Sequence, residues 1–287
     1  METSKTPLVP ALSRALALLE TLAGSKHGLT ISQLARQLHC AKSSVHRLVN
    51  TFEHYGYIYR DGPTGRYRLS LHLCDLANMA LNGISLRDHA RPFLTQLAAR
   101  TGLTVHLAVL EQGSAVLIEK IESPRSIRVA TWVGKQLGLH CTALGKALMA
   151  YLSEEQVDAL LSCHGLLRHN ENTICSVKKF KESLAIIRRR GYALDDEEEE
   201  IGVRCIGAPI LNEKQEAVAA LSVVGRTGQI YPENCSMLAQ LVMVTAHSIS
   251  DHFKAPETPR AEYVSVKTLA EHPIPAVSAG FYADRAS

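Results

Sequence analysis

Residues 31–70 constrain the fold of this chain more than any other segment, because two short helical patterns are followed there by a hairpin. Residues 31–38 and 42–55 both place apolar side chains at helical spacing. Thr30, a residue type favoured at helix N-caps, precedes the first pattern. Residues 58–69 form two short strand patterns around a turn that contains glycine and proline. This order predicts a winged helix-turn-helix.

The predicted winged helix-turn-helix domain extends over residues 1–70, and a helical pattern at residues 12–22 supplies its supporting helix. Residues 1–84 contain nine Lys or Arg against five Asp or Glu, although the whole chain carries a net charge of only +3. The basic excess therefore lies on the segment that resembles a DNA-binding domain.

The polar face of the second helix carries small hydroxyls and cations near its N-terminal end. Such side chains reach phosphates and base edges when a helix enters the major groove of double-stranded DNA. Cations on the hairpin are placed for contact with the phosphate backbone. The simpler alternative is that the polar face is only solvated. The expected DNA contacts are Lys42, Ser43, Ser44, His46 and Arg47 on the helix and Arg66 and Arg68 on the hairpin.

Composition limits the class of protein. The 287 residues are 46% hydrophobic and 21% charged, which suits two folded domains rather than wholesale disorder. Seven cysteines without framework spacing favour a reducing compartment. The polar, proline-containing start does not match a signal peptide, and no apolar run approaches the roughly 20 residues that span a bilayer. We therefore expect a cytoplasmic protein that does not enter the membrane.

The rest of the chain alternates strand and helix patterns. A stiff linker helix is expected over residues 71–84, followed by a domain over residues 85–253 and a flexible tail over 254–287. Hairpins mixed with helices predict an α+β domain in which helices flank an antiparallel sheet. Its expected strands are 105–110, 115–121, 127–133, 192–194, 204–211 and 217–225, and its expected helices are 86–100, 141–151 with a continuation over 154–161, 177–190 and 232–253.

Several segments together resemble the IclR family of bacterial transcriptional regulators, over roughly residues 8–253. They are SSVHRLVNTFEHYGYI (43–58), LHCTALGKALMAYL (139–152), RRRGYALDDEEEEIGVRCIGAPI (188–210) and AALSVVG (219–225). The resemblance implies a winged helix-turn-helix, a linker helix and a C-terminal effector domain similar to GAF and PAS sensors. It also implies that the protein binds small ligands such as carboxylates, sugar acids or aromatics. By the same resemblance, a homodimer or dimer of dimers would bind a palindromic operator and act as repressor or activator.

The resemblance also implies an effector site. Its matched residues are Ala143, Leu144, Asp195 and Cys205, and Ser222 is a weaker candidate on the strand expected to pair near Cys205. Amide groups at a strand-to-helix junction favour a carboxylate, and an aspartate can accept hydrogen bonds from ligand hydroxyls. The alternatives are that Cys205 is plain core and that Asp195 belongs to a solvated acidic run. A small organic acid or sugar acid is the expected effector.

No other chemistry is expected from the motifs. Leu144-Gly145-Lys146 lacks the earlier glycine and the following hydroxyl of a phosphate loop. Adjacent His-Cys pairs such as His140-Cys141 seldom chelate one ion on a strand, where neighbours point to opposite faces. A cluster of Cys163, His164 and His169 has little support. We therefore expect no catalytic residue, metal or cofactor.

Two further classes of function compete with a ligand-responsive DNA-binding regulator. One is a small-molecule-processing enzyme with an appended DNA-binding module, which turnover of a bound carboxylate would reveal. The other is a constitutive nucleic-acid-associated structural protein, which predicts binding without sequence preference and without any ligand effect.

Overall fold

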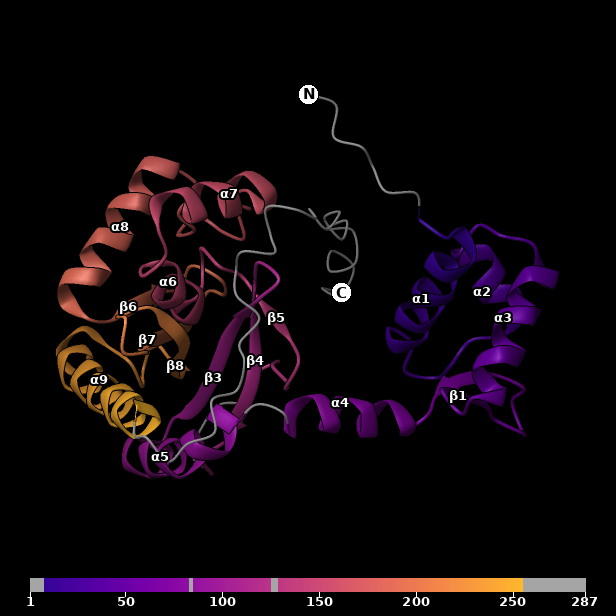
Figure 1. The fold of residues 1–287 in the computed structure, drawn as a ribbon, viewed down its shortest axis with the longest axis horizontal. Coiled ribbons are helices and arrows are strands. Elements are labelled where there is room, and N and C mark those ends of the chain that lie inside the picture. The colour runs from indigo at the N-terminus through magenta and orange to yellow at the C-terminus, as the bar shows by residue number, and fades with distance from the viewer. Residues whose placement is uncertain (1–7, 83–84, 125–128, 255–287) are drawn as a thin grey trace. The chain divides into compact units, whose positions relative to one another are not determined.

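The computed structural model describes residues 8–82, 85–124 and 129–254, and the chain divides into two compact units between residues 83 and 84 (Figure 1). Residues 1–7 and nearly all of the expected tail, residues 255–287, lie outside the described residues. The first unit includes the helix expected as a linker, and the second unit contains the sheet. Each unit is described by itself.

The first unit has the predicted helix-turn-helix order. Helices α1 (Pro10–Ala23), α2 (Ile31–Gln37) and α3 (Lys42–His54) are followed by strands β1 (Ile58–Arg60) and β2 (Tyr67–Leu69) and helix α4 (His72–Asn82). Thr30 caps α2 in a reciprocal capping box with Gln33, as its residue type suggested. The buried apolar side chains of the three helices and the hairpin form one core: Leu18, Leu22, Leu29, Leu34, Ala35, Val45, Val49, Ile58 and Tyr67.

The hairpin is bonded to the chain segment that precedes α2. Strand β1 pairs antiparallel with β2, and the amide of Asp61 donates to the Arg66 carbonyl at 2.8 Å to close the turn. Tyr67 and Leu29 exchange two backbone hydrogen bonds, of 2.8 and 3.1 Å. The wing is therefore held at a fixed position on the helices of this unit.

The second unit contains a six-stranded antiparallel sheet in the order β5-β4-β3-β8-β7-β6. Helices α5 and α9 pack against each other along the sheet, and α6 contacts strands β3, β7 and β8 (Figure 1). The central strands are buried along most of their length, as expected for a sheet covered on both faces. The elements are β3 (Thr104–Glu111), β4 (Ser114–Ile121), β5 (Gln136–Leu137), β6 (Ala193–Asp196), β7 (Val203–Leu211) and β8 (Ala217–Arg226), with α5 (Ser85–Thr101), α6 (Ala143–Met149), α7 (Glu154–His164), α8 (Val177–Arg190) and α9 (Pro232–Lys254).

The strand expected over residues 127–133 is wrong in its described part. Residues 129–133 form no strand, and residues 125–128 lie outside the described residues. The edge strand is instead β5, two residues long, which pairs with Ala115 and Val116. Gly134 adopts a φ of +90°, a left-handed conformation that interrupts extended backbone just before β5.

The expected continuation of α6 into α7 is also wrong. Helix α6 ends at Met149, and α7 begins after Ser153, whose side chain accepts a hydrogen bond from the amide of Gln156 in a second capping box. A good N-cap residue starts a new helix rather than extending the old one.

Glycines place the first turn of α6 against its neighbours. A Cβ on Gly145 would lie 2.5 Å from backbone atoms of Gly138 and Leu139, and one on Gly207 would lie 3.0 Å from the carbonyl oxygen of Ala143. The start of α6 therefore touches the preceding turn and strand β7 backbone to backbone, which fixes the residues at this end of the helix.

We predict that Gly145→Ala lowers the free energy of unfolding of the second unit by about 1–3 kcal/mol, because the added methyl overlaps backbone that cannot yield. Gly228→Ala is the matched control, since a Cβ there meets nothing within 4 Å. Urea unfolding measures both variants. Equal midpoints for Gly145→Ala and the unmodified chain would contradict the packing described above.

Candidate functional site

The five residues expected in the effector site line one cavity of the second unit. The cavity has a volume of about 40 Å³. It lies where the start of α6 meets the sheet and the acidic segment, residues 195–200, which begins in β6. Residues from distant parts of the chain meet there. The lining consists of His106, Val129, Thr131, Leu137, Thr142, Ala143, Leu144, Asp195, Glu199, Glu200, Val203, Cys205, Ser222 and Val224.

Thr142 organises the entry to α6. Its hydroxyl donates to the carbonyl of Gly138 at 2.6 Å and accepts from the amide of Gly145 at 3.0 Å. The amides of Ala143 and Leu144 are the first two of the helix, which an α-helix leaves without an internal acceptor. Ala143 and Leu144, which carry these two amides, both line the cavity.

Asp195 is buried and lines the same cavity. Its side chain accepts from the amide of Glu198 at 2.9 Å, and burial raises its pKa to about 7, against the opposing charge of Lys146. Asp195 pairs with Cys205 across β6 and β7. Burial, followed by the nearby Asp195 carboxyl, raises the pKa of the Cys205 thiol well above its usual range. Near neutral pH the Asp195 carboxyl is therefore about half protonated, and the Cys205 thiol is neutral.

His106 is a cavity residue that the sequence analysis missed. It lies in β3 opposite Ser222 of β8, and its Nε2 is 3.0 Å from the Thr131 hydroxyl. Burial, with the charges of Lys120 and Lys135, lowers its pKa to about 3, so the imidazole is neutral and offers a polar contact. The sequence does contain a signal for this residue, because a histidine within an otherwise apolar strand indicates a buried polar site.

The acidic segment, residues 195–200, begins within β6 and is only partly a solvated face. Asp196 and Glu200 are exposed, but Asp195 and Glu198 are buried. Lys146, itself buried, forms an ion pair with Glu198 and donates to the Leu194 carbonyl at 2.5 Å. A buried lysine inside α6 thus ties the helix to the acidic segment, and the sequence analysis did not identify it.

The same segment is bonded to the loop between α7 and α8. The Thr173 hydroxyl donates to the Glu198 carbonyl at 2.7 Å, and the Asn170 side-chain amide donates to the Glu197 carbonyl at 3.0 Å. These bonds bring residues 169–173 close to the turn before α6. The acidic segment is therefore held from both sides.

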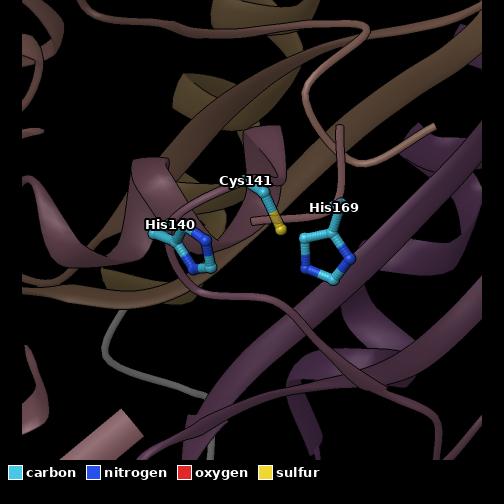
Figure 2. A group of neighbouring side chains, drawn as sticks. All are labelled: His140, Cys141 and His169. Carbon is cyan, nitrogen blue, oxygen red and sulfur yellow. The ribbon is translucent and has the colours of Figure 1, made fainter. Parts of the chain in front are cut away.

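That approach creates a cluster of His140, Cys141 and His169, in which one ligand atom from each residue lies within 4.8 Å of the others (Figure 2). The expectation that neighbouring His and Cys diverge applies to strands, whereas residues 139–141 form a turn. His169 joins this pair rather than a cluster with Cys163 and His164.

The expected DNA contacts differ in exposure. Lys42, Ser43, His46 and Arg47 of α3 are exposed and Ser44 is half-buried. The hairpin arginines are both half-buried, and Arg66 donates to the Gly28 carbonyl at 3.0 Å. Arg60 of β1 is exposed and lies 5.9 Å from the centre of the Tyr67 ring. The helix residues are thus the more accessible group.

The sequence matches two protein-family models. That of the C-terminal domain of the bacterial transcriptional regulator IclR matches residues 78–251, and that of the IclR helix-turn-helix domain matches residues 11–62. The chain is 33% identical over 247 residues to the transcriptional repressor IclR of Escherichia coli (strain K12), covering 85% of this chain and 90% of the relative.

Solved structures agree with that similarity. The Thermotoga maritima IclR structure has a TM-score of 0.73 at 28% identity, covering 85% of this chain and 98% of that one. An IclR homologue from Microbacterium hydrocarbonoxydans, complexed with 4-hydroxybenzoate, has a TM-score of 0.72 at 25% identity, covering 84% of this chain and 99% of that one. Within the described residues, no helix is long and apolar enough to cross a bilayer.

We predict that Lys146→Met lowers the free energy of unfolding of the second unit by about 3–5 kcal/mol, because Glu198 is left as an unpaired buried acid. The double variant Lys146→Met/Glu198→Leu removes both charges and should recover most of that loss. Denaturant unfolding of the three proteins makes the comparison. A single variant as stable as the unmodified chain would show that the ion pair does not hold α6 in place.

Proposed function

Because this chain belongs to the IclR family of bacterial transcriptional regulators, we propose that it binds a palindromic operator as a homodimer or dimer of dimers and that a small organic acid in the α6 cavity changes this binding. Two domains support the proposal: one suits DNA, and the other has a cavity lined by both apolar and polar residues. Since the partner is genomic DNA, we infer a cytoplasmic location.

The proposed DNA contacts are carried by the N-terminal part of α3. Its exposed cations and hydroxyls suit base edges and phosphates of the major groove, while Val45 and Val49 anchor the opposite face in the core. In a symmetric dimer two such helices meet half-sites about 34 Å apart, or a multiple of that. Arg66 and Arg68 of the wing would add contacts to the backbone.

The proposed effector carries one carboxyl group and at least one hydroxyl. The amides of Ala143 and Leu144 would meet the carboxylate, since the lining residues that the structure describes include no lysine or arginine. Asp195, Glu199 and Ser222 would contact hydroxyl groups. The relative complexed with 4-hydroxybenzoate carries a ligand of this class. Sugar acids share the same pair of groups.

The cavity must open to admit such a ligand. Its volume of about 40 Å³ is far below the roughly 300–1,000 Å³ of typical small-molecule sites. The acidic segment contributes the lining residues Asp195, Glu199 and Glu200. Its displacement is therefore the simplest way to widen the cavity. A ligand that favours the opened state then shifts the population between two states of the protein.

One observation carries the effector proposal: Ala143, Leu144, Asp195, Cys205 and Ser222 come from separate segments and line a single cavity. The competing enzyme function has less physical support there. The raised pKa of Cys205 keeps its thiol protonated, and the lowered pKa of His106 makes that imidazole a weak base. The relatives are regulators, in keeping with a sensor.

Asp195→Asn tests the cavity. Below a pH of about 7 Asp195 is mostly protonated and uncharged, and above it the charged form repels a ligand carboxylate in the same cavity. We therefore predict that carboxylate affinity in the unmodified chain falls by up to about tenfold per pH unit above 7, and that the variant loses this dependence. Titration calorimetry with 4-hydroxybenzoate and a set of sugar acids measures the affinity.

The control for this experiment is Asp196→Asn, because Asp196 is exposed and pairs with Arg204 at 2.6 Å outside the cavity lining. Operator affinity without ligand should be the same in both variants. If Asp195→Asn leaves the ligand affinity and its pH dependence unchanged, Asp195 is not part of the effector site.

Arg47→Ala tests the DNA surface. We predict a loss of about 1–3 kcal/mol in operator binding if Arg47 reads a base, or a decrease of about 1 in the slope of log affinity against log salt if it contacts a phosphate. Arg189→Ala, at an exposed site on α8, is the control. Fluorescence anisotropy over a salt series distinguishes the two roles, and an unaltered affinity and slope would remove Arg47 from the interface.

A further inference from the structure

We propose that His140, Cys141 and His169 form a binding site for a zinc-type divalent metal ion. Two imidazoles and a thiol supply the nitrogen and sulfur donors that Zn²⁺ takes in proteins. The three ligand atoms lie within 4.8 Å of one another, and Figure 2 shows the Cys141 thiol pointing into the space between the two rings. His140 and Cys141 are neighbours in the chain, and His169 follows Cys141 by 28 residues.

The hydrogen bond of His140 orients this residue as a ligand. Its Nε2 lies 2.8 Å from the Leu167 carbonyl oxygen. A carbonyl only accepts, so Nε2 carries the proton and Nδ1 keeps its lone pair. Histidines that bind metals are commonly held in this way, with the other ring nitrogen donating to a backbone carbonyl.

The Cys141 sulfur occupies a space next to Gly138 that a larger residue at that position would fill. Cys141 is fully buried, and a Cβ on Gly138 would overlap the Cys141 sulfur, so glycine leaves the space that the thiol occupies. When the ion binds, the thiol proton passes to solvent and the sulfur coordinates as thiolate, which a bound cation stabilises.

The cluster needs a small contraction to reach coordination distances. Zn–N bonds of about 2.0–2.1 Å and Zn–S bonds of about 2.3 Å place tetrahedral ligand atoms about 3.3–3.6 Å apart. The separations of up to 4.8 Å must therefore shorten by about 1 Å. His169 is the ligand able to move, because its side chain is exposed and its ring already lies over that of His140 with centroids 6.0 Å apart.

The surrounding charge also favours a cation. The Glu199 carboxylate lies within electrostatic reach of both Cys141 and His169. Lys146 acts in the opposite direction, but its charge is compensated by the ion pair with Glu198. Three protein ligands leave a fourth tetrahedral position for water or a carboxylate.

The test uses the full chain, reduced and stripped of metal, titrated with Co²⁺ as a spectroscopic substitute for Zn²⁺. We expect one ion per chain, the strong visible bands of tetrahedral Co²⁺, a thiolate-to-metal charge-transfer band, and displacement by Zn²⁺. His169→Ala should lower Zn²⁺ affinity by about 100-fold or more, beyond the roughly 10–100-fold cost of losing a residue that only supports a ligand.

Two further variants make the assignment specific. Cys141→Ser should abolish the charge-transfer band, and His164→Ala, an exposed histidine outside the cluster, should bind as the unmodified chain does. His169 is exposed, so its removal leaves the fold intact and keeps the test valid even if Cys141→Ser does not fold. The proposal is overturned by weak octahedral Co²⁺ bands, by the absence of binding, or by equal Zn²⁺ affinity in His169→Ala and the unmodified chain.

Discussion

The buried ion pair between Lys146 and Glu198 is the interaction on which the second unit's functional region depends. Lys146 stands in a helix of small and apolar residues, where its charge would be costly without a partner. Glu198 and the Leu194 carbonyl supply that partner from the other side of the cavity. Buried pairs add little net stability but penalise arrangements that separate them. The pair therefore specifies where the acidic segment lies relative to α6.

That position determines the chemistry of the cavity. With the acidic segment against α6, Asp195 is buried near Cys205, and this burial raises the pKa of its carboxyl to about 7. The same segment holds the loop of Asn170 and Thr173, which carries His169 to the turn at His140 and Cys141. The effector cavity and the proposed metal site thus border one short stretch, residues 138–145. An ion and an organic acid would act on the same turn.

Local patterns were enough to predict much of this fold. Helix α8 was predicted at its observed bounds, because an amphipathic stripe ends there at Gly191 in a left-handed conformation. The helix-turn-helix followed from Thr30, the stripe of α3 and the Gly-Pro turn. The two-residue strand β5 was missed because its pairing depends on a turn at Gly134 and not on a run of apolar residues.

Only the family resemblance pointed to residues of the candidate effector site. Ala143, Asp195 and Cys205 were named from it, and they do line one cavity. His106, Lys146 and His169 were not, because each gains its surroundings from residues far away in the sequence. Lys146 reads as an ordinary helix lysine until Glu198, 52 residues later, is brought beside it. No spacing in a single sequence contains that information.

The most direct test of this account is the binding of the full chain to the DNA upstream of its own coding region, titrated in the presence and absence of 4-hydroxybenzoate and a series of sugar acids. The account predicts tight, sequence-specific binding whose midpoint one of these acids shifts. Binding that depends on salt but not on DNA sequence, and that no compound alters, would contradict it.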